Sequence, residues 1–259
     1  MTALIETSNL RKEFVLDGGG RLEAIAGASI AINDKEFVCL LGPSGCGKST
    51  WLRIVAGLES ASSGDVLYKG APVTGPGKER GMVFQEYSLL PWRTVADNVS
   101  LGPEFAGMDA KKRREIAMDY LARVGLEKFA EAKPHELSGG MRQRAAIARA
   151  LANNPEVLLM DEPFGALDAH TRVLLQRELL KIWEQDRKTV VFVTHSVDEA
   201  LYLADRIVVM TAHPGRVLEE IDVPFERPRS RATKGYGEMA ERILELLEQN
   251  EKNRGGAEL

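Results

Sequence analysis

The sequence predicts an α/β fold in which a core of buried strands carries an antiparallel β layer and an inserted helical subdomain. Three observations predict it. Short apolar runs alternate with helical segments along the chain. Two strand-like stretches precede a glycine-rich loop at residues 42–49, which stands between an apolar run and a helix. A later stretch, rich in helix-forming residues, separates the first group of strands from the last.

Composition limits the class of protein. With 259 residues, the chain can form one large domain, or a domain with a subdomain, around a full core. The net charge of −4 argues against nucleic acid as the main partner. No apolar run is long enough to span a bilayer, and residues 1–6 do not have the pattern of a signal peptide. The two cysteines, Cys39 and Cys46, stand in a predicted strand and in the loop, which favours a reducing cytoplasm over a disulfide.

The N-terminal segment predicts the antiparallel layer. Residues 3–10 alternate loosely between apolar and polar and predict a strand, and residues 21–32 predict another after a glycine-rich turn. Phe14 follows the first of these strands. It either packs at the edge of the layer or forms a platform on which a nucleotide base stacks, and the local sequence does not choose between the two.

The loop at residues 42–49 reads G-x-x-x-x-G-K-S, the P-loop pattern. The apolar run 37–41 before it predicts a buried strand, and residues 50–56 after it predict a helix. Glycines allow the tight turn that points backbone N–H groups at phosphate oxygens, and the helix N-terminus adds partial positive charge. Lys48 would then reach the β- and γ-phosphates, and the Ser49 hydroxyl would bind Mg²⁺. The sequence therefore predicts a nucleotide site.

The middle of the chain predicts strands at residues 65–70 and 81–84, the second of which runs into Gln85. Residues 86–92 have no helical periodicity but hold a Leu pair and a Trp beside a Pro. Such a loop either packs on its own domain or offers an apolar patch to a partner. Residues 110–124 predict an amphipathic helix, and we interpret its basic start as a solvated face.

A second anion site is predicted where a helix begins. The alanine-rich stretch 144–151 is typical of a helix, and Ser138, Gly139 and Gly140 stand at its N-terminal side. Backbone N–H groups at a helix N-terminus attract anions, which makes this stretch a candidate anion site.

Two carboxylates follow the apolar run 157–160. A hydrophobic strand ending in Asp161 is the context that holds Mg²⁺ in P-loop ATPases, and Glu162 next to it can act as a general base on water. The alternative is a turn that caps a helix. Further along, His195 stands at the end of the predicted strand 189–194. A lone His is more often structural, but ligands bind at the carboxyl ends of strands in α/β sheets, which favours a γ-phosphate contact.

The C-terminal part continues with predicted helices at 169–186, 197–204 and 238–249 and strands at 206–211 and 215–218. Residues 227–231 read Arg-Pro-Arg-Ser-Arg and are interpreted as a linker. For residues 226–259 the composition leaves open docking on a partner, regulation and simple capping of the fold.

Together these motifs resemble the ATP-binding subunits of ABC transporters over most of the chain. The order and spacing of five elements carry the resemblance: the P-loop at 42–49, Gln85, Leu-Ser-Gly-Gly at 137–140, the carboxylate pair at 161–162, and His195. The Leu-Ser-Gly-Gly stretch is the most specific, because simple P-loop ATPases lack it. Residues 91–95, 161–168 and 194–200 look like the branch that imports nitrate, sulfonate or taurine.

The resemblance implies roles for individual residues. Phe14 would stack on adenine, and Ser49, Asp161 and Gln85 would bind Mg²⁺. Glu162 would be the general base, and His195 would contact the γ-phosphate. Ser138 and Gly140 would bind the ATP of the other subunit, and Asp168 would lie at the dimer interface. Gly165 departs from the family, where many members carry Ser, and it has no hydroxyl to take part at that position. The residues expected to contact ATP are Phe14, Gly42, Pro43, Ser44, Gly45, Cys46, Gly47, Lys48, Ser49, Thr50, Ser138, Gly139 and Gly140.

The expected function is therefore ATP hydrolysis that drives uptake of a small solute. The expected assembly is a homodimer of ATPase subunits bound to integral membrane permease subunits at the cytoplasmic face of the inner membrane, served indirectly by a solute-binding protein. We expect an ATPase core at 1–86 and 156–225, a helical subdomain at 87–155, and a C-terminal linker and helix at 226–259. The alternatives are a non-transport ABC ATPase, an importer subunit for another solute class, and a non-catalytic module with a degenerate site. The last is disfavoured because Lys48, Asp161, Glu162 and His195 are all present.

Overall fold

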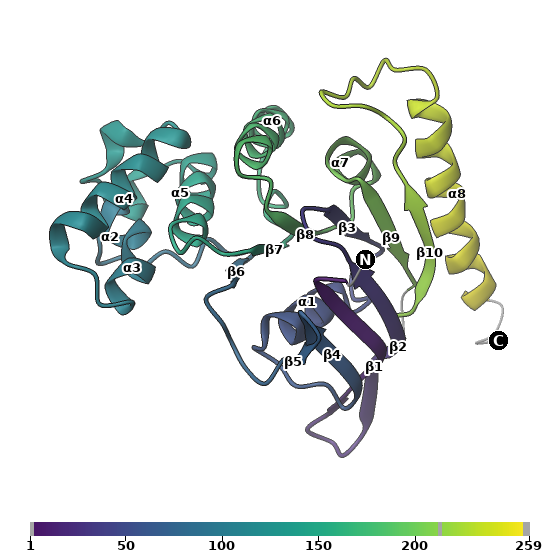
Figure 1. Ribbon diagram of the computed structural model, residues 1–259. Helices are drawn as coiled ribbons and strands as arrows, with labels where there is room; N and C mark the ends of the chain where they lie inside the picture. The colour runs from purple at the N-terminus through teal and green to yellow at the C-terminus, as the bar shows by residue number, and fades with distance from the viewer. Residues whose placement is uncertain (1–2, 212–213, 256–259) are drawn as a thin grey trace. The chain divides into compact units, whose positions relative to one another are not determined.

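The computed structural model describes residues 3–211 and 214–255. It divides the chain into two compact units, the first made of residues 1–76 and 190–259 and the second of residues 77–189. Figure 1 labels the helices and strands of both. The predicted C-terminal segment 226–259 ends outside the described residues, and its boundaries, like those of the helical subdomain 87–155, stay predictions.

The first unit contains the predicted antiparallel layer. Strands β1 (Ile5–Val15), β2 (Arg21–Ile32), β4 (Ser63–Tyr68) and β5 (Ala71–Pro72) form a sheet in the order β2-β1-β4-β5, and every pairing in it is antiparallel. Strand β1 does not end at residue 10 as expected. Asn9, at φ 48°, forms a bulge between Thr7 and Leu10, and the pairing with β2 then resumes. Phe14 therefore lies inside a strand, opposite Leu22.

The other strands of the first unit run in the order β10-β9-β3-β8: β10 (Val217–Asp222), β9 (Arg206–Met210), β3 (Phe37–Leu41) and β8 (Thr189–Thr194). Strand β3 is parallel to both β9 and β8, and all five of its residues are buried. A central strand with both faces covered needs a continuous apolar run, which is the pattern that predicted it.

Three helices of the first unit are α1 (Lys48–Ala56), α7 (Val197–Leu203) and α8 (Tyr236–Gly255). Helix α1 is capped by Gly57, whose left-handed backbone (φ 76°) lets its N–H bond to the Arg53 and Ile54 carbonyls. Helix α8 begins two residues earlier than predicted and lies along β10, to which an ion pair between Arg242 and Glu219 joins it (Figure 1).

The second unit pairs two parallel strands, β6 (Arg80–Val83) and β7 (Val157–Asp161), with helices. Those helices are α2 (Val95–Val99), α3 (Leu101–Phe105), α4 (Ala110–Arg123), α5 (Gly139–Leu151) and α6 (Ala169–Asp186), with 3₁₀ turns at Glu127–Phe129 and Pro134–Glu136. Side-chain caps fix several starts: Asp109 for α4, Ser138 for α5 and Asp168 for α6. Helices α2 and α3 were not predicted, because each is too short to show a period. The predicted α/β fold with its antiparallel layer and helical insert is confirmed.

Candidate nucleotide site

The P-loop joins β3 to α1 within the first unit, as predicted. Gly45 and Gly47 adopt φ 77° and 88°, the left-handed region that favours glycine. The Lys48 side chain is 3% exposed, and its Nζ donates to the carbonyls of Gly42 (2.7 Å) and Pro43 (2.8 Å). The ammonium group is thus held over the loop by backbone oxygens. A phosphate bound there would replace those carbonyl oxygens as the hydrogen-bond partner of the Lys48 ammonium group.

Cys46 is a buried member of this loop. Its Sγ lies 3.6 Å from Lys48 Nζ. Burial raises the pKa of the Cys46 thiol, and Lys48 opposes that rise. The thiol is therefore protonated and unreactive at neutral pH as long as the loop keeps this conformation.

The P-loop packs against backbone from two other segments. A Cβ on Gly47 would lie 2.6 Å from the Ala24 carbonyl oxygen of β2, and a Cβ on Gly42 would lie 2.6 Å from that of Met210. Gly215, after β9, makes the closest of these three approaches: a Cβ there would lie 2.1 Å from the Cys46 carbonyl oxygen. Its N–H and C=O also bond to Ala24 and Ala26 of β2. The sequence predicted Gly215 as the first residue of a strand at 215–218, whereas β10 begins at Val217.

Replacing Gly215 by alanine should displace the P-loop, because the contacted atom is backbone and cannot rotate away. We expect ATP affinity to fall about tenfold, since phosphate contacts tolerate little misplacement. Labelling of Cys46 by a maleimide under native conditions, located by peptide mass mapping, should accelerate. Gly237→Ala, where a Cβ meets nothing within 4 Å, is the matched control. A folded Gly215→Ala protein with wild-type affinity and labelling would show that the loop does not depend on this contact.

The structure brings His195 to the edge of the sheet where the P-loop begins. Strands β3 and β8 are parallel and in register from Phe37–Val190 to Leu41–Thr194, so Gly42 and His195 leave neighbouring strands at the same level. His195 is exposed, and the residue before it, Thr194, is buried. This is the placement expected of a ligand-binding residue at the carboxyl end of parallel strands.

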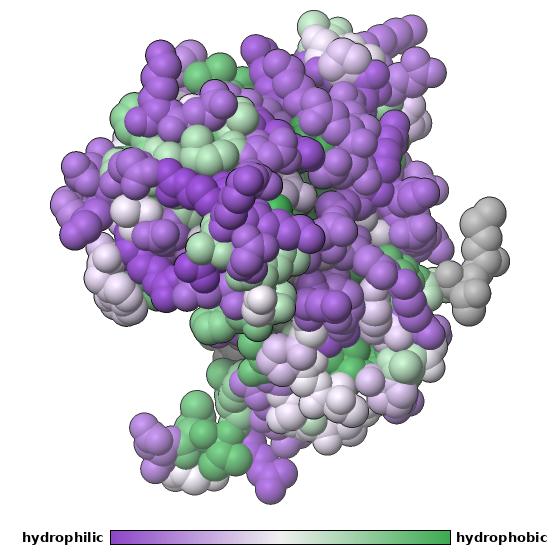
Figure 2. All heavy atoms as spheres, turned by 60° about the vertical axis from the view of Figure 1, so that its left-hand side comes forward, coloured by the Kyte–Doolittle hydropathy of each residue, from purple (hydrophilic) through white to green (hydrophobic). Residues whose placement is uncertain are grey.

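Phe14 lies on β1, which pairs with β2 near the point where the Ala24 carbonyl of β2 contacts Gly47 of the P-loop. Its partner Leu22 is two residues from Ala24, whose carbonyl faces Gly47. The ring is half-buried, and Lys12 Nζ lies 4.8 Å from its centroid while bonding to Glu59 at 2.7 Å. Beyond it, the hairpin tip exposes Val15 (77%) and Leu16. This tip is the lowest point of Figure 1 and a hydrophobic projection at the bottom of Figure 2.

The second unit brings the predicted acidic pair and Gln85 to one edge. Strands β6 and β7 are parallel, with Val83 opposite Met160, so Gln85 and the pair Asp161–Glu162 lie at neighbouring strand ends. Asp161 ends β7 and is buried. Glu162 adopts φ 41°, in the left-handed region that non-glycine residues seldom enter, and its carbonyl accepts the Gly165 N–H at 3.1 Å.

Ser138 caps α5, accepting the Met141 N–H at 3.3 Å, so the N-terminal turn of α5 holds Gly139 and Gly140 as predicted. A Cβ on Gly140 would lie 2.8 Å from Thr171 Cγ2, so a side chain there would require Thr171 to shift. Asp168 caps α6 through the Thr171 N–H, and this hydrogen bond lowers the pKa of Asp168.

The loop after Gln85 is fastened by two residues that the sequence did not single out. Arg149 of α5 donates to the carbonyls of Ser88 (2.5 Å) and Tyr87 (3.2 Å). The buried Asn98 side chain accepts the Leu90 N–H at 2.7 Å and donates to carbonyls of the same loop. The Arg149 contacts join segments that only the fold brings together, because Ser88 lies 61 residues away along the chain. Asn98 acts within one stretch, 8 residues from Leu90.

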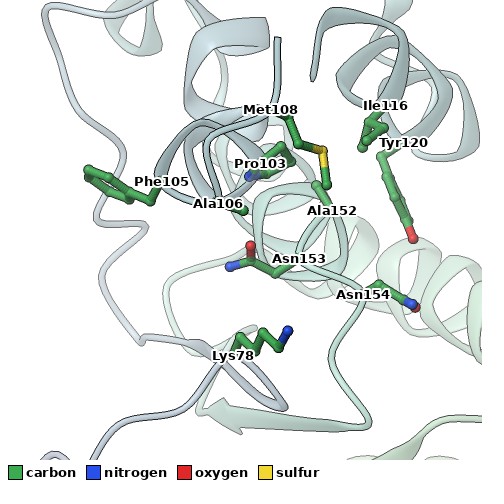
Figure 3. A pocket seen from close by; sticks show the side chains of 11 residues that line it. Lys78, Pro103, Phe105, Ala106, Met108, Ile116, Tyr120, Ala152, Asn153 and Asn154 are labelled. Atoms are coloured by element: carbon green, nitrogen blue, oxygen red, sulfur yellow. The ribbon is translucent and has the colours of Figure 1, made fainter. Parts of the chain in front are cut away.

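The second unit also holds a hollow of about 580 Å³ whose lining is mostly apolar. Met108, Ile116 and Tyr120 gather at one end and Lys78 lies at the other (Figure 3). None of its lining residues belongs to the predicted nucleotide site.

Within the described residues, no three His, Cys, Asp or Glu side chains come together in a metal-binding group. Mg²⁺ that arrives with a nucleotide needs fewer protein ligands, because phosphates and water complete its shell. Among the helices of the described residues, none combines the length and the apolar character needed to cross a membrane.

Comparison with known proteins gives a consistent result. Residues 25–165 match the family model described as "ABC transporter". The chain is 52% identical, over 95% of its length and 92% of the relative's, to an uncharacterized ABC transporter ATP-binding protein of Methanocaldococcus jannaschii. It is 47% identical to the taurine import ATP-binding protein TauB of Rhizobium johnstonii, over 92% of this chain and 94% of TauB. It is 48% identical to the nitrate import ATP-binding protein NrtD of Synechococcus elongatus, over 82% of this chain and 78% of NrtD.

The fold also matches a solved structure. This is a dimeric ATP-binding cassette in a post-hydrolysis state with ADP and Pi bound. The TM-score is 0.76 at 36% identity, and the match covers 86% of this chain and all of the other.

Proposed function

Because this chain belongs to the ABC transporter family and is one of its ATPases, we propose that it hydrolyses ATP to drive uptake of a small solute through separate membrane permease subunits. The observation that carries the proposal is the P-loop, with Lys48 buried over it and His195 leaving the neighbouring strand at the same level. The names of two relatives, a taurine and a nitrate import protein, support import as the direction.

ATP and Mg²⁺ suit the residues present. The P-loop turns tightly at Gly45 and Gly47, whose left-handed backbone favours glycine, and α1 begins within the loop at Lys48, so the N–H groups of its first turn belong to the site. The hydroxyl of Ser49, the buried carboxylate of Asp161 and the amide of Gln85 are hard oxygen donors of the kind that Mg²⁺ prefers. When bound, Mg²⁺ would neutralise charge on the β- and γ-phosphates.

In the proposed mechanism different residues of this chain bind the nucleotide, activate water and sense the nucleotide state. Phe14 stacks on adenine, and residues 42–50 bind the phosphates through N–H groups and Lys48. Glu162 accepts a proton from the attacking water, and His195 donates a hydrogen bond to the γ-phosphate. Gln85 senses the nucleotide, and it directly precedes residues 86–92, the loop that faces the membrane partner.

We propose a homodimer with two-fold symmetry, in which Ser138 and Gly140 of one subunit bind the ATP held by the other. Asp168 would then lie at the dimer interface. ATP bridges the subunits, so its binding favours the closed dimer and its hydrolysis releases it. The dimeric relative with ADP and Pi supports this arrangement. A subunit of this kind works peripherally, at the cytoplasmic face of the cell membrane, and a solute-binding protein delivers the solute to the permease.

For the solute we propose the nitrate, sulfonate or taurine class, because relatives of similar identity carry taurine and nitrate in their names. The test is an affinity pull-down of this chain from detergent-solubilised membranes of its source. Recovery of a multi-spanning permease supports the proposal, and the permease with its solute-binding protein then narrows the solute. Recovery of ribosomes or DNA without a permease would favour a non-transport ATPase instead.

We also propose where the permease docks. Trp92 (71% exposed) and Phe105 (82%) present large apolar side chains on the second unit. Trp92 stands on the loop that Arg149 and Asn98 fasten, so it is exposed without being free to move far. Phe105 borders the apolar hollow of Figure 3. Aromatic side chains held in this way are typical of the centre of an interface.

The double variant Trp92→Ser, Phe105→Ser should recover about tenfold less permease in the pull-down, since loss of two such contacts removes most of a binding hot spot. Nucleotide binding by the isolated chain should persist. Leu244→Ser on α8, another exposed apolar side chain, is the control. If the double variant recovered as much permease as the wild-type chain, the permease would dock elsewhere on the subunit. Leu89 and Leu90 are unsuitable for this test because they are half-buried.

A further inference from the structure

The segment between β10 and α8 packs along α7, the helix that begins at Val197, just after His195. We call residues 224–236 the strap. It contains the Arg-Pro-Arg-Ser-Arg stretch that the sequence suggested was a linker. In Figure 1 the strap leaves the end of β10 and reaches the start of α8 on the side of α7. The arginines in it have specific partners.

The strap first covers the C-terminal end of α7. Arg229 Nη1 donates to the carbonyls of Leu201 (2.9 Å) and Tyr202 (3.2 Å), and Arg227 Nη2 donates to that of Leu203 (2.5 Å). The last carbonyls of a helix lack partners within it, and positive charge there is favourable. The Arg229 residue is 6% exposed, and burial lowers its pKa to about 10, which leaves it charged at neutral pH.

The strap then reaches the first turn of α7. Arg231 Nε and Nη2 each donate to one carboxylate oxygen of Asp198, both at 2.6 Å. The hydroxyl of buried Tyr236 lies 3.2 Å from the Asp198 carbonyl oxygen and 3.3 Å from its Oδ1. The Arg231 guanidinium also lies over the Tyr202 ring, 4.9 Å from its centroid. Planar bidentate pairing of this kind fixes direction as well as distance.

That first turn is bonded to both neighbours of His195. The Thr194 hydroxyl donates to Glu199 Oε2 at 2.5 Å and accepts the Ser196 N–H at 3.0 Å. The Ser196 hydroxyl in turn caps α7 by accepting the Glu199 N–H at 3.4 Å. A helix as short as α7 has little stability of its own and depends on such outside contacts. The backbone on each side of His195 therefore follows the first turn of α7, which the strap holds.

We propose that Arg231 and Tyr236 are positioning residues that hold His195 at the carboxyl edge of the sheet through Asp198 and the first turn of α7. The inference rests on the proposed contact of His195 with the γ-phosphate. It gives the C-terminal segment a part in turnover, beyond capping of the fold.

The test uses the full chain with Tyr236→Phe, Arg231→Ala, the double variant and Arg231→Lys. The control is Arg242→Ala, which breaks the ion pair with Glu219 elsewhere on α8. Readouts are kcat and KM for ATP, thermal unfolding, and the imidazole NMR signal of His195, assigned by its loss in His195→Gln. In the double variant we expect kcat to fall about tenfold with KM changed less than about twofold, because the phosphates still bind while one group is misplaced. The His195 signal should shift, Arg231→Lys should recover part of the loss, and the control should show neither effect.

A folded double variant with an unmoved His195 signal and wild-type kcat overturns the inference. If the double variant does not fold, Tyr236→Phe, which removes only a hydroxyl, decides the question by the same two readouts. Failure of the proposed function looks different. In that case His195→Gln itself keeps the wild-type rate, whether or not the signal shifts in the strap variants.

Discussion

Glu162→Gln should bind ATP but turn it over at least about 100-fold more slowly, because a general base typically contributes 10²–10⁴-fold and an amide cannot accept the proton. The carboxylate leaves the end of β7 directly after buried Asp161, so the substitution keeps shape and hydrogen-bonding reach at that edge. With hydrolysis blocked, the ATP-bound dimer should accumulate. Steady-state phosphate release and size-exclusion chromatography in Mg²⁺-ATP measure the two effects.

The matched control is Glu241→Gln, which removes a carboxylate from the exposed face of α8. It should change neither turnover nor the elution profile. Wild-type turnover in Glu162→Gln would remove Glu162 as the base. Loss of ATP binding in that variant would instead assign the residue to the binding of nucleotide.

Lys48→Ala should weaken ATP binding about 10- to 100-fold, since a hydrogen bond to a charged group is worth about 1.5–3 kcal/mol. Lys48 is buried and already aligned over the P-loop by the carbonyls of Gly42 and Pro43. Binding to phosphate therefore needs little rearrangement of the side chain. Equilibrium titration with a fluorescent ATP analogue measures the affinity without relying on turnover.

Lys181→Ala, on the exposed face of α6, is the control for this experiment and should bind nucleotide normally. Removal of Lys48 also leaves two loop carbonyls without that donor, so thermal unfolding should accompany the titration. An unchanged affinity in a folded Lys48→Ala protein would contradict the proposed role.

The sequence predicted the fold well where a signal is local. The continuous apolar run at β3 and the glycine pattern after it require no knowledge of distant contacts. The caps of α5 and α6 are likewise encoded by Ser138 and Asp168 next to their helices. The common edge of β3 and β8 could be predicted because parallel strands place their carboxyl ends together.

What the sequence did not predict depends on contacts between distant segments. Gly215 was predicted to begin a short strand, and only the fold shows its backbone against Cys46. The strap arginines have the composition of a solvated linker, yet Arg229 is buried against the end of α7. The extension of β1 through Phe14 depends on the bulge at Asn9, which no period in the sequence reveals.

The backbone at Glu162 has a consequence for how this protein can evolve. A non-glycine residue at φ 41° costs on the order of 1–3 kcal/mol, which is a sizeable share of the stability of an ordinary domain. Glycine would relieve that strain and would remove the carboxylate. Selection for heat resistance alone therefore favours a change at this position that selection for turnover forbids. Stabilised variants from an unguided screen should be sequenced at residue 162 before any other, because a gain in melting temperature can be a loss of the enzyme.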